Sequence, residues 1–517
     1  MIAALATLLV GLSTVYFFSR ALLHFTQDAR EPPAVHTSVP FVSPLIGLGR
    51  EGLKFWVARK HLPIYTLRFP FTRLYIVNST ALVSSVQRQV RSVSFSPVLV
   101  RMASSLMGVS KPGLEIIARD SLEEHSFVMQ TPKALHPSLS PGAKLNALNT
   151  RAVSVLAASL EKFGTAEEPS VLKMNEWIRH QVMMATTEGI YGPGNPFRDP
   201  AIRDVWHKYE TGLIPLMMSI APALTARESL RMRETLVKRY ERYYDEHGYL
   251  DPEASAFIKD RYEFFSRFGL GHEDIARLEV ASSIALIGNT MPATFWLVFH
   301  ILSDKAVLED CRGELSKALQ EHDGVCTFDV GYMKSSCPIF FSTFQEVLRF
   351  HGIGVSARVV TEDATINDQY LLKKGGIVLI PGAAQHHLSS AWGEKADTFD
   401  HRRFVPEAGS RKRRYDPAAF RGFGGGSTLC PGRHFASTEM LAFTALIVLR
   451  FEIQPRSGRW VAPTTAKSNP GTSVEQPDYD IDVEIRSRDH RRWAVTMSGS
   501  DKPMMISAED IAAVGAE

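Results

Sequence analysis

The segment FGGGSTLCPGR, residues 423–433, constrains the fold of this chain more than any other feature of its sequence. Consecutive glycines permit backbone dihedrals that other residues avoid, so a flat ligand can approach the chain closely. Cys430 comes shortly after them and is predicted to open a helix, with Pro431 in the first turn. Free N–H groups and the positive end of the helix dipole favour a thiolate at such a position. The loop therefore predicts an anionic sulfur ligand for a metal.

Other interpretations of this loop lack the residues that they need. A phosphate-binding loop requires Gly-Lys-Ser/Thr, which is missing. A nucleophile elbow requires a glycine two residues after Ser427, where Leu429 stands. A zinc site requires further Cys or His ligands at short spacing, and none flanks Cys430. A formal dinucleotide fingerprint at 47–52 follows a proline-rich segment and lacks its acidic partner, so we reject it. A buried structural cysteine is the remaining alternative.

The composition is that of a globular protein with reduced thiols. The chain has 517 residues, 45% hydrophobic and 22% charged, with a net charge of +3. This balance excludes the broad basic surface of a nucleic-acid binder, so no nucleic-acid partner is expected. The four cysteines are too few and too clustered for an extracellular disulfide framework. They are Cys311, Cys326, Cys337 and Cys430.

The N-terminal segment is long and apolar. Residues 1–19 contain no charged side chain, and about 18 apolar residues are the minimum for crossing a bilayer. A cleaved signal peptide would need a basic n-region and an A-x-A site, and both are missing. A buried core helix is the other alternative. We predict a transmembrane anchor over residues 1–25, followed by a proline-rich, extended and semi-rigid hinge over 26–50.

A basic stretch follows the predicted hinge. Between Glu51 and Glu115 the chain has no acidic residue but nine basic ones. The positive-inside tendency then keeps this side of the anchor in the cytoplasm. The stretch is suited to contact anionic headgroups or an acidic protein, although an ordinary solvated face is an equal alternative for most members. The nine residues are Lys54, Arg59, Lys60, Arg68, Arg73, Arg88, Arg91, Arg101 and Lys111.

The body, residues 51–496, is predicted to be one domain, mostly α-helical with a smaller β region, an α+β fold. Apolar residues recur at spacings of three and four between about 145 and 350. Short β-prone runs separated by Gly, Asn and Asp occupy 355–405. Helix returns after Cys430, and the runs DIDVEI and RWAVTM predict a last pair of strands. Residues 497–517 are predicted to form a disordered tail.

At this point the chain resembles the cytochrome P450 family. The family's haem loop reads Phe-x-x-Gly-x-Arg/His-x-Cys-x-Gly, and four residues match it: Phe423, Gly426, Cys430 and Gly432. The resemblance extends upstream, in the family's order and spacing, to the Glu-x-x-Arg of the K helix and to a later Arg, here Glu346, Arg349 and Arg403. It covers the chain from the N-terminal anchor to about residue 496.

The resemblance assigns roles to these residues. Cys430 is implied to be the proximal axial ligand of the iron of haem b. Glu346, Arg349 and Arg403 are implied to form a buried structural cluster. Thr428 departs from the family pattern, which often has Arg or His there for a haem propionate. Arg358 is expected to serve as the propionate partner instead, with Arg433 as a weaker second.

A second informative stretch is ALIGNTMPATFW, residues 285–296. Pro292 has no N–H for the carbonyl of Gly288, so a kink with a free carbonyl beside the Thr290 hydroxyl is predicted to hold water. A kinked core helix with incidental polar residues is the alternative. The stretch resembles the sterol 7α-hydroxylase and prostacyclin synthase branch, and Asn289 stands where most family members have an acid. Gly288, Asn289 and Thr290 are thus the expected proton-delivery residues, with the relay in question at Asn289.

The resemblance implies a membrane-anchored haem-thiolate monooxygenase. Two electrons would come from NADPH through a separate NADPH-cytochrome P450 reductase, since the chain has no flavin fingerprint. The anchor would place the enzyme in the endoplasmic reticulum membrane, single-pass, with its catalytic domain facing the cytoplasm. The basic stretch and the run Arg411–Arg414 are expected to dock the acidic reductase.

The expected substrate is a lipophilic polycyclic small molecule, either a terpenoid, a sterol-like compound or a related natural product. The sequence resembles fungal members of secondary metabolism. The apolar, Met-rich segment 212–224 is predicted to be a flexible lid, with a packed core helix as the equal alternative. Two other functions remain open: a haem-thiolate isomerase or dehydratase that needs no reductase, and a non-catalytic membrane scaffold that binds no haem.

Overall fold

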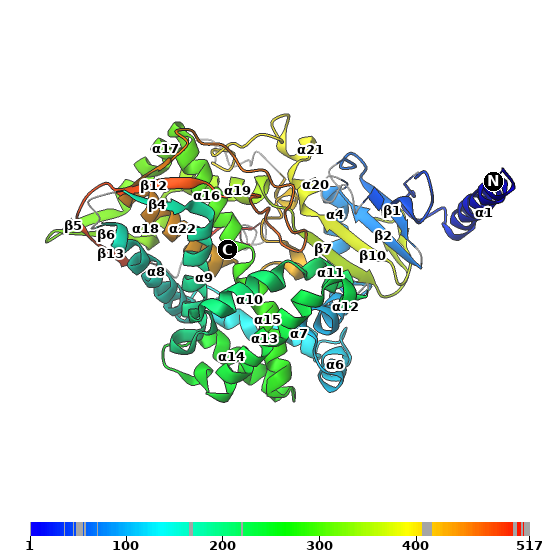
Figure 1. Ribbon diagram of the computed structural model, residues 1–517, viewed down its shortest axis with the longest axis horizontal. Helices are drawn as coiled ribbons and strands as arrows, with labels where there is room; N and C mark the ends of the chain where they lie inside the picture. The colour runs from blue at the N-terminus through cyan, green and yellow to red at the C-terminus, as the bar shows by residue number, and fades with distance from the viewer. Residues whose placement is uncertain are drawn as a thin grey trace. The chain divides into compact units, whose positions relative to one another are not determined.

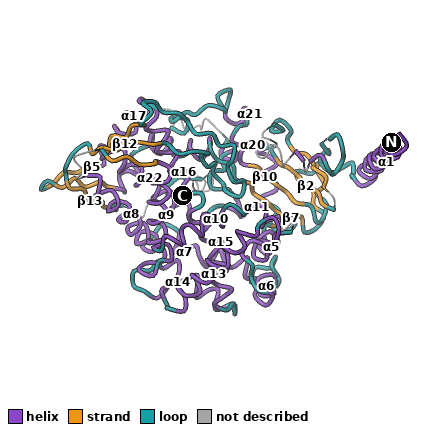
Figure 2. Tube along the Cα trace, in the orientation of Figure 1, coloured by secondary structure: helices purple, strands orange, loops and turns teal. Residues whose placement is uncertain are grey.

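The computed structural model describes most of the chain, and its residues fall into two compact units. The sheet unit comprises residues 1–98, 353–397 and 415–428, and the helical unit comprises 99–352, 398–414 and 429–517. Helices predominate and strands are fewer (Figure 2), which confirms the predicted α+β class. The described residues are 2–35, 37–44, 46–47, 55, 58–69, 71–164, 169–218, 221–405, 416–499, 504–507 and 510.

The sheet unit is built on a five-stranded sheet of order β1-β2-β10-β7-β3 (Figure 1). β1 and β2 form an antiparallel hairpin, and β10 runs parallel to β2 and antiparallel to β7. Tyr75, Val77 and Val378 are fully buried on one face of this sheet. The strands β2 and β10, which lie far apart in the sequence, therefore share one core. The strands are β1 Ile64–Phe69, β2 Thr72–Val77, β3 Val93–Ser94, β7 Val355–Val360 and β10 Ile377–Pro381.

Short elements complete the sheet unit. β8 and β9 form a separate antiparallel pair. The helix α4 contributes Leu82, Val83 and Val86 to the core of the large sheet. The β-prone texture predicted for 355–405 is confirmed for 355–381 by β7 to β10, whereas the helices α20 and α21 follow in the rest of that range. The bounds are α1 Ile2–Thr26, α4 Thr80–Arg88, β8 Ala364–Ile366, β9 Tyr370–Leu372, α20 Gly382–His386, α21 Ser389–Trp392, η6 Pro417–Ala419 and η7 Gly426–Thr428.

The helical unit has a core formed by α16 and α22, which pack against each other and against α9. Both helices are buried on nearly every side, which is typical of a helix in the centre of a core. Its helices are α5 Ser96–Met102, η1 Ala103–Met107, α6 Lys111–Ala118, α7 Phe127–Leu139, α8 Ala143–Gly164, α9 Met174–Tyr191, η2 Gly192–Gly194, η3 Pro196–Arg198, α10 Pro200–Glu210, α11 Leu213–Met218, α12 Pro222–Thr225, α13 Arg227–Asp245, η4 Gly248–Leu250, α14 Ala256–Arg267, α15 His272–Ile287, α16 Thr290–Ser303, α17 Lys305–Leu315, η5 Ser316–Ala318, α18 Val330–Ser336, α19 Pro338–Phe350 and α22 Arg433–Arg450.

Two small sheets lie at the edge of the helical unit. One has the order β11-β12-β4 and the other β13-β6-β5. The two β-prone runs predicted near the C-terminus are found as β12 and β13. The bounds are β4 Ser170–Lys173, β5 Leu319–His322, β6 Val325–Asp329, β11 Phe451–Pro455, β12 Asp482–Ser487 and β13 Arg492–Thr496.

The long helix predicted around residue 288 is interrupted where the sequence indicated. α15 ends at Ile287 and α16 begins at Thr290, with a turn between them. The helical run His272–Ser303 is long and apolar enough to span a membrane, and among the residues whose side chains the structure describes it is the one such run, but 72% of its apolar window is buried in the protein. That burial is typical of a core helix.

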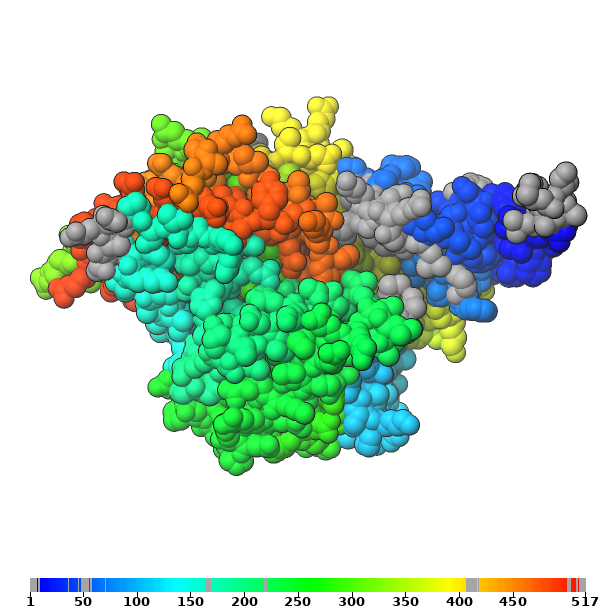
Figure 3. Space-filling model, viewed as in Figure 1, coloured from blue at the N-terminus to red at the C-terminus, as the bar shows by residue number. Residues whose placement is uncertain are grey.

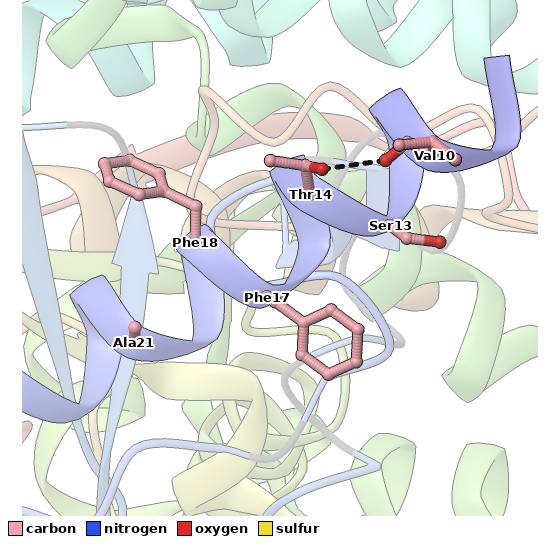
Figure 4. Close-up of a pocket in the computed structure, with 6 residues that line it drawn as sticks. All are labelled: Val10, Ser13, Thr14, Phe17, Phe18 and Ala21. Carbon is pink, nitrogen blue, oxygen red and sulfur yellow. Dashed lines mark hydrogen bonds between the residues drawn. The ribbon is translucent and has the colours of Figure 1, made fainter. Parts of the chain in front are cut away.

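The N-terminal helix α1 has open apolar side chains. Val15, Phe17 and Phe18 are 61%, 69% and 68% exposed, and the atoms of this helix are open to the surroundings in Figure 3. Figure 4 shows Phe17 and Phe18 extending from different sides of the helix, while the Thr14 hydroxyl donates to the Val10 carbonyl at 2.8 Å. This bond satisfies the Thr14 hydroxyl within the helix, which makes the helix surface more apolar.

The predicted extended hinge differs from the backbone observed after α1. Ala34 forms a parallel bridge with Thr66, as an extended segment would. Further on, however, Ser43 N donates to Val39 O at 3.0 Å and Ile46 N donates to Val42 O at 3.2 Å. These are helical turns, so the expectation of extended backbone is wrong for the described residues 39–44 and 46. Such turns can contain proline, because the N–H that proline lacks would have no intrahelical partner in a first helical turn.

The predicted disordered tail, 497–517, also contains packed residues. Met504 and Ile506 are 3% and 0% exposed. Ser507 is buried as well, and Asp510 forms an ion pair with Arg433 at 2.6 Å. Disorder is therefore not observed for 504–507 and 510, because Met504 and Ile506 bury apolar surface that a polar tail would lack.

Candidate active site

A cavity of about 360 Å³ lies within the helical unit, and Cys430 is in its wall. Its other walls come from segments far apart in sequence: α5 and η1, α7, α14, α15 and the start of α22. The lining is mostly apolar, with Ala285 and Leu286 on α15 and Phe435 on α22 among its members. The fold thus joins the two stretches that the sequence singled out, the cysteine loop and the long helix.

Cys430 is half-buried, whereas the other three cysteines are buried. It lies three residues before α22, which begins at Arg433, so the prediction that Cys430 opens the helix is wrong by one turn. Burial raises the pKa of the Cys430 thiol, while a backbone hydrogen bond from Gly432 and the charge of Arg433 lower it. Cys430 therefore has an N–H group near it, as predicted, and a cation as well, but it does not lie at the helix terminus itself.

The other cysteines have inert surroundings. Burial raises the pKa of the Cys311 and Cys337 thiols to about 12, and burial also raises the pKa of Cys326. Buried thiols of this kind are structural and unreactive. No cluster of three or more His, Cys, Asp or Glu side chains able to hold a metal occurs in the described part of the chain.

The glycines of the loop adopt conformations that require glycine. Gly424 and Gly426 have positive φ values of 78° and 57°. A Cβ on Gly426 would also lie 3.0 Å from the Gln87 side chain. Both facts explain why this loop contains glycine between Phe423 and Thr428. The Thr428 hydroxyl closes the turn by donating to the Gly425 carbonyl at 3.0 Å.

Glu346, Arg349 and Arg403 form a buried ionic cluster in the helical unit. The Arg349 Nε donates to Glu346 Oε2 at 2.7 Å and its Nη2 donates to Oε1 at 2.8 Å. The Arg403 Nε lies 3.1 Å from Oε1 and 3.0 Å from Oε2. The carboxylate also accepts the Asp400 N–H at 2.9 Å. Both carboxylate oxygens of Glu346 thereby accept hydrogen bonds, as a buried charge requires.

Arg358 is a buried cation of the sheet unit and is only 1% exposed. Its hydrogen bonds go to three hydroxyls, those of Ser356 at 2.8 Å, Ser427 at 3.4 Å and Thr428 at 3.3 Å. Burial, together with the charge of Arg421, lowers the pKa of Arg358 to about 10. Within the described ranges no carboxylate forms an ion pair with Arg358. A cation buried among neutral hydroxyls is suited to bind an anion.

Arg433, the weaker expected propionate partner, is already engaged. Its guanidinium forms short hydrogen bonds to both oxygens of Asp510, the shortest 2.6 Å, and its Nη1 donates to the Cys430 carbonyl at 3.2 Å. Burial would raise the pKa of Asp510, but the hydrogen bonds and charge of Arg433 lower it on balance. Sequence reasoning missed this pair because Asp510 lies in the segment predicted to be disordered.

The helix break carries the three expected proton-delivery residues. Gly288 and Asn289 form the turn between α15 and α16, and Pro292 has no N–H to donate to the Gly288 carbonyl. The Thr290 hydroxyl donates to the Leu286 carbonyl at 3.1 Å. Asn289 Oδ1 accepts the Ser473 N–H at 2.6 Å. The break thus follows directly on the part of α15 that lines the Cys430 cavity.

A charged residue in the cavity wall escaped sequence reasoning. Arg261 on α14 lines the cavity, is 4% exposed and forms an ion pair with Glu279 at 3.2 Å. Glu279 also accepts hydrogen bonds from Tyr191 at 2.8 Å and Tyr244 at 3.1 Å. In the sequence, Arg261 is one of several charges on an ordinary amphipathic helix, so no local signal distinguishes it.

Comparison with known proteins places this architecture in a family. The family model described as "Cytochrome P450" matches residues 227–483. Cytochrome P450 monooxygenase nodJ of Hypoxylon pulicicidum is 31% identical over 498 residues, which cover 93% of this chain and 95% of that protein. A cytochrome P450 monooxygenase of Gibberella zeae is 27% identical over 473 residues, covering 89% of this chain and 88% of that protein.

A solved structure has the same fold. The structure described as "Retinoic acid bound cyanobacterial CYP120A1" has a TM-score of 0.68 and 17% sequence identity, and the match covers 89% of this chain and all of that chain. With the full-length relatives, the chain belongs to the cytochrome P450 family. It is accordingly an oxidoreductase that incorporates oxygen, with the haem cofactor of that family.

Proposed function

We propose that the Cys430 thiolate would hold the iron of haem b and that this chain hydroxylates or oxidises a lipophilic polycyclic substrate. The observation that carries the proposal is the position of Cys430, since it is half-buried in the wall of a largely apolar cavity while the other cysteines are buried elsewhere. Bound haem supplies the redox centre at which dioxygen is activated. The remaining steps depend on residues of this chain.

The residues present fit a haem. Cys430 offers a thiol with the Gly432 N–H and the Arg433 cation near it; these lower the pKa of the thiol toward the thiolate that the iron needs, against burial, which raises the pKa. Arg358 offers a buried positive charge whose partners are neutral hydroxyls, and a carboxylate such as a propionate would satisfy it. Arg433 is the weaker candidate because Asp510 already neutralises it. Phe423, Gly426 and Gly432 shape the cofactor loop.

We assign the helix break to proton delivery. The Gly288 carbonyl, freed by Pro292, and the Thr290 hydroxyl, which can accept while it donates to Leu286, are able to hold a water molecule. A water so held could relay protons into the cavity from the part of α15 that lines it. Asn289 completes this group as a neutral amide, which orients but does not carry a proton.

Glu346, Arg349 and Arg403 are assigned a structural role. Their side chains are 0%, 0% and 8% exposed, and their charges are paired with one another, so they are not accessible to a substrate. Their function would be to hold α19 to the segment after Thr398, whose carbonyl accepts from both arginines.

Electrons are proposed to come from NADPH through NADPH-cytochrome P450 reductase, docked by exposed cations. Arg88, Arg91 and Arg101 are exposed and suited to an acidic partner. Arg68 is not suited to such a partner, because it is 8% exposed and donates hydrogen bonds to Thr26 and Gln27. Lys54 and the run Arg411–Arg414 lie outside the described residues.

We propose that α1 anchors the chain in the endoplasmic reticulum membrane, with the catalytic domain in the cytoplasm. Its apolar side chains are open to the surroundings, and a 25-residue helix is long enough to cross a bilayer. The proposed anchor comprises residues 1–25 and precedes the 26–50 connection and the 51–496 catalytic domain. A membrane position would also give a lipophilic substrate, such as a terpenoid or sterol-like compound of secondary metabolism, direct access.

Isotope labelling tests the reaction. Membranes containing the enzyme and its reductase are incubated with NADPH, ¹⁸O₂ and a panel of sterols and terpenoids, and products are read by mass spectrometry. A product that gains one ¹⁸O atom only when NADPH and reductase are present supports the monooxygenase. A rearranged product formed without NADPH would show that the enzyme is an isomerase instead of a monooxygenase.

A further inference from the structure

Asn289 makes one contact that its expected role in proton delivery does not explain. Its Oδ1 accepts the backbone N–H of Ser473, 2.6 Å away and 184 residues later in the chain. Ser473 belongs to a loop, residues 469–476, that we call the 469–476 loop. We propose that Asn289 is a positioning residue that fixes the 469–476 loop to the helix break. The inference rests on the proposed function, because it concerns the same site.

The 469–476 loop is also joined to the end of α10. Asn469 Nδ2 donates to the Glu210 carbonyl at 2.7 Å, and Gln476 Nε2 donates to Glu210 Oε1 at 2.8 Å. Glu210 is buried and is held in place by Arg179 at 3.2 Å. The two ends of the loop are therefore attached to one buried residue.

The loop packs against the segment predicted to be a lid. A Cβ on Gly471 would lie 3.1 Å from the Leu213 Cβ and 3.6 Å from the Ile214 side chain, so the backbone of the loop is in close contact with the start of α11. Leu213 and Leu216 are each 1% exposed, whereas Leu224 on α12 is 85% exposed. The 212–224 segment thus has a packed beginning next to the loop and an open end.

A further set of bonds fixes the second half of the loop. Glu475 N donates to the His351 carbonyl at 2.9 Å, and Trp296 Nε1 donates to the Glu475 carbonyl at 2.8 Å. Val474 forms a bridge with Gly352 and is 2% exposed. Ser473, by contrast, is exposed, and its N–H bond to Asn289 is the tie between the middle of the loop and the helix break.

The consequence is mechanical coupling between α11 and the helix break. Loss of the Asn289 bond frees the N–H of Ser473 and loosens the loop between its two anchored ends. α11 then loses part of its support, while Cys430 and its loop are untouched. Asparagine supplies the acceptor without a charge, and aspartate would supply the same acceptor. The helix break follows directly on Ala285 and Leu286, which line the Cys430 cavity, so a large ligand that reaches this end of the cavity should sense the change and a small one should not.

Ligand binding to the full-length holoenzyme tests the coupling, with two azoles as probes. Clotrimazole is bulky and fills the space around the cofactor, whereas imidazole is small. We expect Asn289→Ala to weaken clotrimazole binding by about 3- to 10-fold, the usual effect of one hydrogen bond, and to leave imidazole affinity within about 2-fold. Asn289→Asp should restore clotrimazole binding. Ser473→Ala, which keeps the backbone N–H, is the matched control and should bind both azoles normally.

Hydrogen exchange separates this inference from the proposed function. Peptides that cover 469–476 should exchange faster in Asn289→Ala and in Ser473→Pro, which lacks the donor, and at the wild-type rate in Ser473→Ala. Unchanged exchange in Asn289→Ala would overturn the positioning role, whatever the azoles do. Exchange does not depend on haem, so a chain that binds no haem would refute the proposed function and still decide the role of Asn289.

Discussion

Removing the charge of Glu346 should destabilise the protein strongly. Glu346→Gln keeps the volume of the side chain but leaves Arg349 and Arg403, which are 0% and 8% exposed, without their carboxylate. Breaking a buried ion pair from one side costs about 3–5 kcal/mol. A typical folded domain is stable by only about 5–15 kcal/mol. The variant should therefore lose a large part of its stability.

The measurement is thermal unfolding of the holoenzyme followed by circular dichroism, with Glu309→Gln as the matched control. Glu309 lies 3.7 Å from Lys305 on the surface of α17, and its side chain is 66% exposed. The same charge removed there should cost at most a few tenths of a kcal/mol. Glu346→Gln should unfold many degrees lower than Glu309→Gln. Equal unfolding midpoints for the two variants would refute the buried-cluster argument.

Three further predictions follow from other sites. Arg358→Gln should lower haem retention roughly tenfold, as expected for a lost charge-assisted hydrogen bond, with the exposed Arg88→Gln as control; equal haem content in both would argue against a propionate partner. Burial raises the pKa of Glu439 to about 8, against a small lowering by Thr186. The folded state then binds more protons than the unfolded state above the ordinary pKa of glutamate. The contribution of Glu439 to the free energy of unfolding should therefore fall as the pH rises from roughly 4.5 to 8, by about 1.4 kcal/mol per pH unit for one proton. Glu439→Gln should remove this contribution from the slope in denaturant titrations; an unchanged slope would show that Glu439 is not the titrating group. Deletion of residues 2–20 should move the protein from the membrane pellet to the supernatant with its haem spectrum intact, and a truncated chain that still pellets would show that α1 is not the anchor.

The class of fold and several local features around the candidate site residues could be predicted because each depends on local chemistry. The glycine loop requires positive φ at Gly424 and Gly426, and the sequence shows the glycines directly. The break at Gly288 follows from Pro292 because proline lacks the N–H that would continue the helix. Glu346 and Arg349 are one helical turn apart, so their pairing is local as well.

The remaining contacts depend on tertiary structure and leave no local signal. Arg433 resembles any arginine after a cysteine loop, and only the position of Asp510 shows that it is neutralised. Arg261 and Glu279 lie on different helices and meet only when α14 and α15 pack. The bond between Asn289 and Ser473 spans 184 residues. In the same way, burial of Ile506 and the helical turns near Ser43 arise from packing that composition does not reveal.

The most direct test of the central claim is the absorption spectrum of the reduced, CO-bound protein. A thiolate ligand from Cys430 predicts a Soret band at about 450 nm for the wild type, the position that gives the family its name. Cys337→Ala, which removes a buried thiol outside the Cys430 cavity, should keep this band. Cys430→Ala should lose it. A Cys430→Ala protein that retains the 450 nm band would contradict the assignment of Cys430 as the iron ligand.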